Sequence, residues 1–319
     1  MSGVGPEGAV DRADAAGAAD AGAPALRRVR VLFNPRSGPH FSFERLCRAL
    51  SPTWDVPGID LVYQPSLSAD DGAEKARRAV ADGVDTLLVA GGDGMVNSIG
   101  AAVVGSPVAF GVIPAGSANG FARHFGIPLD WEEAAACLAT ARRQAIDVGV
   151  ANGRPFFVTC SMAWEAALVR AFERSPVRGV LPYLFSGAAG FLDYTHQPFR
   201  VEIDGEPEAV YEDPTVFTVA NLTQYGAGAR IAPSAREDDG RLELVVIGRR
   251  DVPSVVARLA RLFDGTIEGL REVQFRAFRA LTVRRERAAP IQMDGELLLP
   301  VKEIRITLKA KALRVLVPR

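Results

Sequence analysis

Apolar runs of strand length alternate with segments of helical spacing from Arg28 to about residue 139. The apolar runs lie at 29–33, 59–63, 86–90 and 108–113, and the helical patterns lie at 41–50, 73–81, 95–104, 118–125 and 131–139. Strands that are apolar on both faces and alternate with helices are typical of a parallel sheet covered on both sides. The first part of the chain is therefore predicted to be a doubly wound α/β domain.

The pattern changes near Gln144, after which strand-like runs follow one another with few helices between them. Two runs, 145–150 and 156–160, flank an Asn152-Gly153 pair, which predicts a hairpin with a tight turn. Further strand-like runs lie at 199–203, 216–220, 242–247, 273–278, 281–283, 304–308 and 313–317. We expect a first domain over residues 27–143 and a second, β-rich domain over residues 144–308.

Two helical insertions interrupt the β-rich part. One covers 164–172 and is followed by an apolar stretch at 180–192, which is broken by glycine and proline. Such breakers suit a mobile lid, and a buried core helix is an equal alternative. The other insertion covers 252–263 and carries its apolar residues on one stripe, as an amphipathic helix does.

Residues 1–26 are rich in Ala, Gly and Asp and nearly lack aromatic and long aliphatic side chains. Such a segment cannot offset its ordering entropy, so we expect a disordered tail. It also lacks the apolar core of a secretory signal, and no apolar run approaches the length of a membrane span.

Charge and cysteine usage narrow the class of protein. The formal net charge is -1, which gives no basic surplus for a nucleic-acid partner. The three cysteines are scattered without a CxxC, and the three histidines form no cluster. A disulfide framework and a zinc site are therefore not expected, and a reducing cytoplasm fits best.

Three glycine-rich turns each follow a predicted strand of the first domain. They are 34–38 (NPRSG), 91–94 (GGDG) and 114–119 (PAGSAN). Loops at the carboxyl ends of parallel strands line one crevice, and glycine lets backbone N–H groups approach phosphate oxygens. Asp93 adds an acid, which beside a phosphate is useful for orienting a metal, a water or a hydroxyl. The sequence therefore predicts a nucleotide site, although each loop alone is compatible with an ordinary turn.

Several common sites are excluded by their missing motifs. No GxxxxGK[ST] occurs, so the chain is not a P-loop protein, and no GxGxxG follows the first strand. No GxSxG occurs either, which argues against a serine hydrolase.

Taken together and in order, the motifs resemble the diacylglycerol kinase catalytic-domain family, in its bacterial soluble lipid-kinase branch related to sphingosine and ceramide kinases. The resemblance covers residues 28–319. It rests on NPxSG at 34–38, GGDG with Asn97, PxGSxN at 114–119, an IAP…DDG stretch at 231–240, and DGE at 294–296.

The resemblance implies a domain of the NAD-kinase and diacylglycerol-kinase type, followed by a β-sandwich-like domain. It also implies that the last strand, within about 309–319, returns to the first domain. The expected activity is transfer of the γ-phosphate of ATP to a lipid hydroxyl. The residues expected at the nucleotide are Asn34, Pro35, Arg36, Ser37, Gly38, Ser68, Gly91, Gly92, Asp93, Gly94, Met95, Val96, Asn97 and Ser117. Ser68 is equally suited to cap a helix.

The resemblance also implies roles for carboxylates. Asp294 or Glu296 of the second domain accepts the proton of the acceptor hydroxyl, and the choice between them stays open. Asp93 of the first domain is expected as a third catalytic acid. The Asp-Gly pair is also compatible with a plain hairpin turn. Asp239, with the backbone carbonyls of Arg236 and Arg241, matches a magnesium site, for which a metal-free turn is the alternative.

The chain departs from the family pattern at three positions: Met95 replaces a threonine, Ser98 a glutamate and Gly120 an aspartate. These departures leave the lipid acceptor open among diacylglycerol, sphingoid and ceramide types. Two other functions stay as alternatives, namely a kinase of a soluble acceptor such as NAD and a nucleotide- or lipid-binding regulator without turnover.

A lipid kinase without a membrane span has to meet its acceptor at the membrane surface, so we expect a cytoplasmic protein in peripheral contact with the membrane. The basic residues Arg284, Arg285 and Arg287 are candidates for attraction to anionic headgroups. We also allow for a homodimer.

Overall fold

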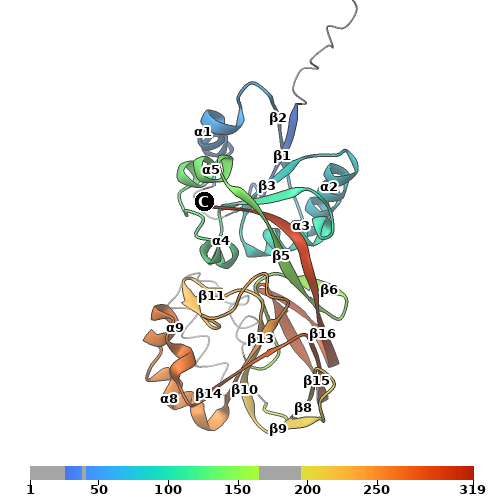
Figure 1. Ribbon diagram of the computed structural model, residues 1–319, viewed down its shortest axis with the longest axis vertical. Coiled ribbons are helices and arrows are strands. Elements are labelled where there is room, and N and C mark those ends of the chain that lie inside the picture. The colour runs from blue at the N-terminus through green and yellow to red at the C-terminus, as the bar shows by residue number, and fades with distance from the viewer. Residues whose placement is uncertain (1–25, 38–40, 165–194) are drawn as a thin grey trace, which may run out of the picture.

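The computed structural model describes residues 26–37, 41–164 and 195–319, which form two domains joined by long strands (Figure 1). The first domain contains four parallel strands in the order β4-β3-β1-β2. They are β1 (Arg27–Phe33), β2 (Ile59–Pro65), β3 (Thr86–Gly91) and β4 (Ala109–Pro114). β3 and β4 are buried along their whole length, as the continuous apolar runs predict.

Helices cover both faces of this sheet, with α1 and α5 on one side and α2 and α3 on the other (Figure 1). Their bounds are α1 (Phe43–Trp54), α2 (Ala69–Ala81), α3 (Asp93–Val103), α4 (Gly120–His124) and α5 (Trp131–Ala139). Side chains at the N-termini of α1, α2 and α5 accept backbone N–H groups that would otherwise lack partners: Ser42 from Arg45, Ser68 from Asp71 and Asp130 from Glu133. The doubly wound α/β prediction is confirmed.

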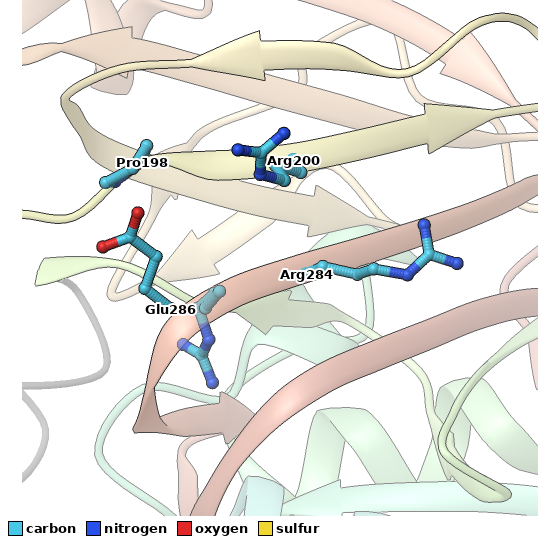
Figure 2. A pocket seen from close by; sticks show the side chains of 5 residues that line it. Pro198, Arg200, Arg284 and Glu286 are labelled. Atoms are coloured by element: carbon cyan, nitrogen blue, oxygen red, sulfur yellow. The ribbon is translucent and has the colours of Figure 1, made fainter.

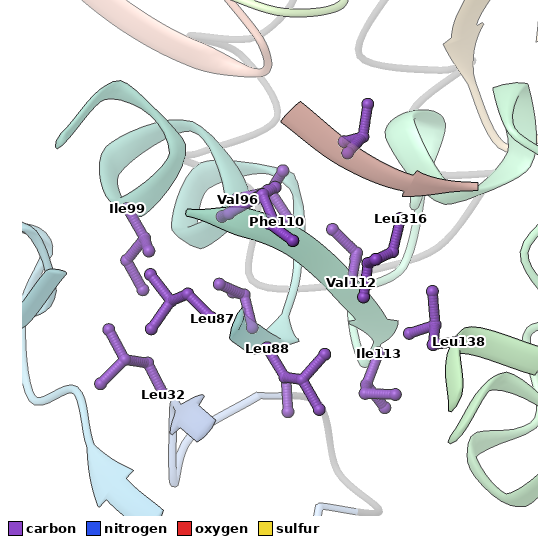
Figure 3. Packing of buried hydrophobic residues seen from close by; sticks show 14 of the residues in the cluster. Leu32, Leu87, Leu88, Val96, Ile99, Phe110, Val112, Ile113, Leu138 and Leu316 are labelled. Atoms are coloured by element: carbon purple, nitrogen blue, oxygen red, sulfur yellow. The ribbon is translucent and has the colours of Figure 1, made fainter. Parts of the chain in front are cut away.

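The core of the first domain lies between these layers (Figure 3). Leu32, Leu87 and Leu88 from the sheet are fully buried and pack with Ile99 of α3 and Phe110 of β4. Leu316, near the far end of the sequence, belongs to the same cluster. The first domain is thus completed by residues of the last strand.

The second domain is built mainly from antiparallel strands along the path β14-β13-β10-β7-β15-β16. The bounds are β5 (Arg142–Ala151), β6 (Arg154–Phe156), β7 (Thr159–Ser161), β8 (Phe199–Ile203), β9 (Ala209–Tyr211), β10 (Pro214–Ala220), β11 (Gln224–Gly226), β12 (Ala229–Arg230), β13 (Leu242–Gly248), β14 (Val273–Phe278), β15 (Ala280–Met293) and β16 (Glu296–Val317). The expected β-sandwich-like second domain is confirmed as a fold class.

β16 connects the domains. Its first half pairs with β15, and its last residues pair antiparallel with β5 and parallel with β4 of the first domain. The sequence pattern gave the runs 304–308 and 313–317 as separate strands, whereas the structure joins them into one strand whose register shifts between Lys309 and Leu313. A bend at this shift carries the chain from one domain into the other.

The predicted helix at 252–263 is broken into two short helices, α8 (Val252–Val256) and α9 (Ala260–Asp264), between η1 (Arg249–Asp251) and η2 (Ile267–Gly269). The intervening N–H groups of Arg258 and Leu259 bond three residues back, to Val255 and Val256, which tightens the backbone into 3₁₀ geometry. The other insertion, at 164–172, lies outside the described residues from residue 165 onward, and so does the apolar stretch at 180–192.

Candidate active site

The GGDG and PAGSAN loops meet at the carboxyl ends of β3 and β4. A Cβ atom on Gly116 would lie 2.5 Å from the Cα of Gly92, so the two backbones approach as closely as only glycine allows. The N–H of Ala115 donates to the carbonyl of Gly91 at 3.0 Å. The loops that were predicted to share one crevice are therefore in contact.

The NPRSG loop follows β1 on the same edge of the sheet. The N–H of Asn34 donates to the carbonyl of Ala90 at 3.2 Å, and the Asn34 side chain accepts the N–H of Arg36 at 2.8 Å. Pro35 and Arg36 are exposed, whereas Ser37 is buried. Gly38, the last expected contact in this loop, lies outside the described residues.

Asn119 shapes the third loop. It has a positive φ of 50°, and its side-chain amide exchanges hydrogen bonds with the N–H and the carbonyl of Gly116 at 2.9 and 2.8 Å. This closed ring fixes the loop and leaves Ser117 exposed at its tip. Ser117 is thus available to a ligand.

Asp93 is the first residue of α3 and points toward the start of α4. It is half-buried, and its carboxylate accepts the N–H of Phe121 at 3.5 Å. Burial raises the pKa of Asp93 to about 6, and repulsion from Asp294 adds to the shift. A Cβ on Gly120 would lie 3.9 Å from this carboxylate, so the absence of a side chain there leaves Asp93 facing backbone.

Asp294 lies opposite, in the turn between β15 and β16, where Asp294 and Gly295 have φ values of 48° and 89°. Its carboxylate accepts four hydrogen bonds, from the N–H groups of Phe157, Val158 and Thr159 at 2.8, 2.8 and 3.0 Å and from the amide of Asn97 at 2.6 Å. Burial raises the pKa of Asp294, and these donors act against that shift. The Asp-Gly pair is therefore a hairpin turn and also ties α3 of the first domain to the second domain.

Glu296 has the opposite surroundings. It is exposed, and its Oε1 would lie 3.0 Å from a Cβ on Gly94, so the carboxylate reaches the GGDG loop across the junction of the domains. Two residues that the sequence could not tell apart are thus distinct, because Asp294 has its oxygens filled by protein donors while Glu296 faces the loops.

The other residues expected at the nucleotide lie around the same edge. Met95 covers Gly91, where a Cβ would come within 2.5 Å of its sulfur, and Val96 is buried in the core. Ser68 caps α2 beyond the end of β2, so its capping role is present in the structure. Asn97, which the motif assigned to the nucleotide, donates to Asp294 and to the carbonyl of Pro155.

A partly buried cluster between the domains was missed by the sequence analysis, which found only that the three histidines form no cluster. The Nδ1 atom of His124 accepts the N–H of Thr223 at 3.2 Å, and Nε2 lies 3.3 Å from Glu237. Glu237 also accepts the side-chain amide of Gln144 at 2.7 Å. The hydrogen bond with His124 lowers the pKa of Glu237 to about 2. No sequence motif marks these residues, because their contacts span about a hundred positions.

The loop expected to hold a cation contains Asp239, which is exposed and accepts the N–H of Arg241 at 3.0 Å. The buried Asp147 anchors the loop by accepting the N–H of Gly240 at 2.7 Å. One exposed carboxylate with carbonyls of the same loop is an oxygen donor set that suits a hard cation. Among the described residues, no group of three or more His, Cys, Asp or Glu side chains is arranged to hold a metal.

The basic run of the second domain is engaged in internal contacts around a pocket of about 120 Å³ lined by Pro198, Arg200, Arg284, Arg285 and Glu286 (Figure 2). Arg285 is 5% exposed and donates to carbonyls of Met162, Ala289, Pro290 and Val301. Arg284 lies within 4 Å of three glutamates, at 3.2, 3.3 and 3.8 Å. Arg285 thus stabilises the bulge of β15 and Arg284 is balanced by glutamates, whereas Arg287 is exposed and donates to the carbonyl of His196.

Two family models match the chain. Residues 28–151 match the diacylglycerol kinase catalytic domain, and residues 159–317 match the YegS C-terminal NAD kinase beta sandwich-like domain. Among the described residues, no helix is long and apolar enough to cross a bilayer.

Relatives and solved structures agree with these models. A diacylglycerol kinase of Mycobacterium tuberculosis (strain ATCC 25618 / H37Rv) is 30% identical over 302 residues, which cover 92% of this chain and 96% of the relative. A diacylglycerol kinase of Staphylococcus carnosus (strain TM300) is 24% identical over 276 residues, covering 85% and 89%. The crystal structure of a diacylglycerol kinase from Bacillus anthracis str. Sterne has the same fold, with a TM-score of 0.71 at 20% identity over 91% of this chain and 97% of that one.

Proposed function

Because the chain belongs to the diacylglycerol kinase catalytic-domain family and is a lipid kinase, we propose that it transfers the γ-phosphate of ATP to a hydroxyl group of diacylglycerol or a closely related lipid. One observation carries the proposal. The three glycine loops and two acids, Asp93 and Glu296, come together from both domains at one edge of the sheet. Phosphoryl transfer needs this combination of phosphate-binding backbone and a proton acceptor.

The nucleotide phosphates are proposed to bind at the tips of the three loops. Gly92 and Gly116 keep their backbones close, and exposed Ser117 and Arg36 supply donors to phosphate oxygens. Asn97 acts indirectly in this scheme, because its amide already donates to Asp294. The family implies ATP as the co-substrate, and magnesium would accompany the nucleotide to balance its charge.

Glu296 is the group that we propose as the proton acceptor. A carboxylate that accepts four hydrogen bonds, as Asp294 does, has no open position for a substrate hydroxyl. Glu296 is exposed and reaches Gly94, where a lipid hydroxyl could approach both the carboxylate and the phosphate loops. Asp93, with its raised pKa, is proposed to orient the nucleotide and its metal ion from the other side.

A structural magnesium ion is proposed at Asp239, with backbone oxygens of Arg236 and Arg241 as further ligands. When bound, the ion would hold the loop between β12 and β13 in one conformation. The loop has protein anchors as well, because Asp147 accepts the N–H of Gly240. The ion is therefore expected to add to an existing structure rather than create it.

The test is to incubate the protein with labelled ATP and magnesium and a panel of diacylglycerol, sphingosine, ceramide and NAD, and to identify products by mass spectrometry. The proposal expects a phosphorylated lipid and no phosphorylated NAD, and Glu296→Gln should remove that product. Phosphorylated NAD would instead favour the soluble-acceptor alternative. ATP binding without any product would favour a regulator.

We further propose a cytoplasmic protein that contacts the membrane peripherally.

A further inference from the structure

The two short helices α8 and α9 expose apolar side chains that the protein interior does not use. Val255 is buried, and Val252 and Leu262 pack against the core beneath them. In contrast, Val256, Leu259 and Phe263 are 60%, 36% and 52% exposed. Val256 ends α8, Leu259 precedes α9 and Phe263 lies within α9, so the three side chains belong to one short stretch of chain. We refer to these three side chains as the apolar face.

Two cationic residues precede the apolar face along the chain. Arg249 and Arg250 of η1 precede α8, are exposed and form no ion pair among the described residues. The segment also carries acids: Asp251 directly follows the two arginines, Glu272 pairs with Arg258, and Asp264 and Glu268 accept hydrogen bonds from Thr266 and Ser234. Exposed apolar residues next to arginines are typical of a helix that lies in a membrane interface.

The apolar face is linked to the site by a short series of contacts. The guanidinium of Arg230 in β12 donates to the carbonyl of Phe263 at 3.0 Å. β12 pairs with β11, and a Cβ on Gly226 of β11 would lie 3.6 Å from the Cβ of Ala118 in the phosphate loop. Figure 1 shows α9 beside β11 on the side of the second domain that faces α4. A bilayer on this surface would thus lie near the place where the acceptor is used.

We propose that Val256, Leu259 and Phe263, together with Arg249 and Arg250, form the surface that docks this enzyme on an anionic lipid bilayer. The inference rests on the proposed lipid-kinase function and names where its acceptor is met. The apolar side chains enter the headgroup boundary, and the two arginines bind lipid phosphates. This surface differs from the basic run at 284–287, where Arg284 lies beside three glutamates and Arg285 is buried.

The experiment measures binding to vesicles without chemistry, by co-sedimentation with phosphatidylcholine vesicles that contain or lack phosphatidylglycerol. Leu259→Ser/Phe263→Ser should lower partitioning to both vesicle types by about tenfold or more. Arg249→Gln/Arg250→Gln should lower it only for anionic vesicles, by about tenfold, with the difference fading as salt rises. Val210→Ser is the matched control, because Val210 is also an exposed apolar residue (47%) but lies on β9, outside the proposed docking surface.

Turnover gives the second measurement. The variant Leu259→Ser/Phe263→Ser should lose activity toward long-chain lipid in vesicles. It should keep activity toward a short-chain acceptor in solution, and its melting temperature should be unchanged. Vesicle binding equal to wild type would overturn the docking surface. A lowered melting temperature with equal loss on both acceptors would also overturn it, and would indicate that another segment of the chain covers these side chains. If wild type binds vesicles yet phosphorylates no lipid, the proposed function fails while the docking surface stands.

Discussion

The two acidic turns that face each other across the domain junction, 91–94 and 294–296, differ in how the protein treats its carboxylates. Asp93 is partly buried, accepts the N–H of Phe121 at 3.5 Å with the N–H groups of Gly120 and Asn119 also directed at it, and has a pKa raised to about 6. Asp294 is buried and accepts four short hydrogen bonds. Glu296, two residues later, is exposed.

This difference shows that an acid in a motif does not by itself reveal a catalytic role. A carboxylate whose oxygens are all occupied by buried protein donors is fixed and stabilises the structure, whereas one that a ligand can reach can exchange partners during a reaction. We therefore expect Asp294 to act on stability and Glu296 and Asp93 to act on turnover.

Glu296→Gln should lower kcat by about two to four orders of magnitude, the usual loss when a general base is removed. The change is isosteric on an exposed side chain, so the melting temperature should stay within about 1 °C of wild type. Steady-state kinetics with ATP and lipid, together with thermal unfolding, measure both values. If this variant keeps its turnover, Glu296 is not the proton acceptor, and the proposed division of roles between Glu296 and Asp294 is wrong.

Asp93→Asn should lower turnover by about two orders of magnitude and also change how stability depends on pH. Because its folded pKa of about 6 lies above the ordinary value, the folded state favours the protonated acid. The stability that protonation provides is fully present below about pH 4 and is lost as pH rises through 6. Asparagine, which stays neutral, should stabilise the fold above pH 6 by at most about 3 kcal/mol and by little at pH 4.

The measurement is chemical denaturation of wild type and Asp93→Asn between pH 4 and 8. In parallel, kcat/KM of wild type should rise as pH passes through about 6, if the ionised carboxylate is the working form. If the stability difference between wild type and Asp93→Asn does not change with pH, the pKa of Asp93 is not raised by burial.

Asp294→Asn should destabilise the protein by about 1–3 kcal/mol, because an amide nitrogen would face backbone donors and leave them unsatisfied. Asparagine tolerates the positive φ of 48° at this position, so the turn itself is retained. Denaturant unfolding gives the free energy, and Asn97→Ala is a useful companion, since it removes only the donor from α3. Wild-type stability with lost turnover would reverse the roles that we assign to the two acids of this turn.

Asp239→Ala should have the smallest effect, at most about 1 kcal/mol in the presence of magnesium, because Asp147 still anchors the loop through Gly240. Chelation of magnesium should lower the stability of wild type by a similar amount and leave the variant unaffected. If magnesium stabilises neither protein, the structural-ion proposal is wrong, and the exposed Asp239 serves only the turn with Arg241.

Local chemistry made loops, turns and caps predictable in both domains. The glycine loops, the Asn152-Gly153 turn and the Ser68 cap depend on residues within a few positions of one another, so a sequence pattern contains them. The role of Asp294 could not be found this way, because its backbone donors lie 135 to 137 residues earlier in the chain. The same limit applies to His124 and Glu237, which lie 113 residues apart in the chain. The break between α8 and α9 is not marked in the apolar pattern of 252–263.

The path of β16 has a consequence for how the protein is made. Residues 314 and 315 pair with β4, and Leu316 packs in the first core, although β1 to β4 are synthesised long before them. During translation, the outer edge of β4 therefore stays without this partner until nearly the whole described chain has left the ribosome. An unpaired apolar strand edge is a site of aggregation. We expect nascent chains that stop before residue 313 to depend on chaperones, even though they contain every phosphate loop.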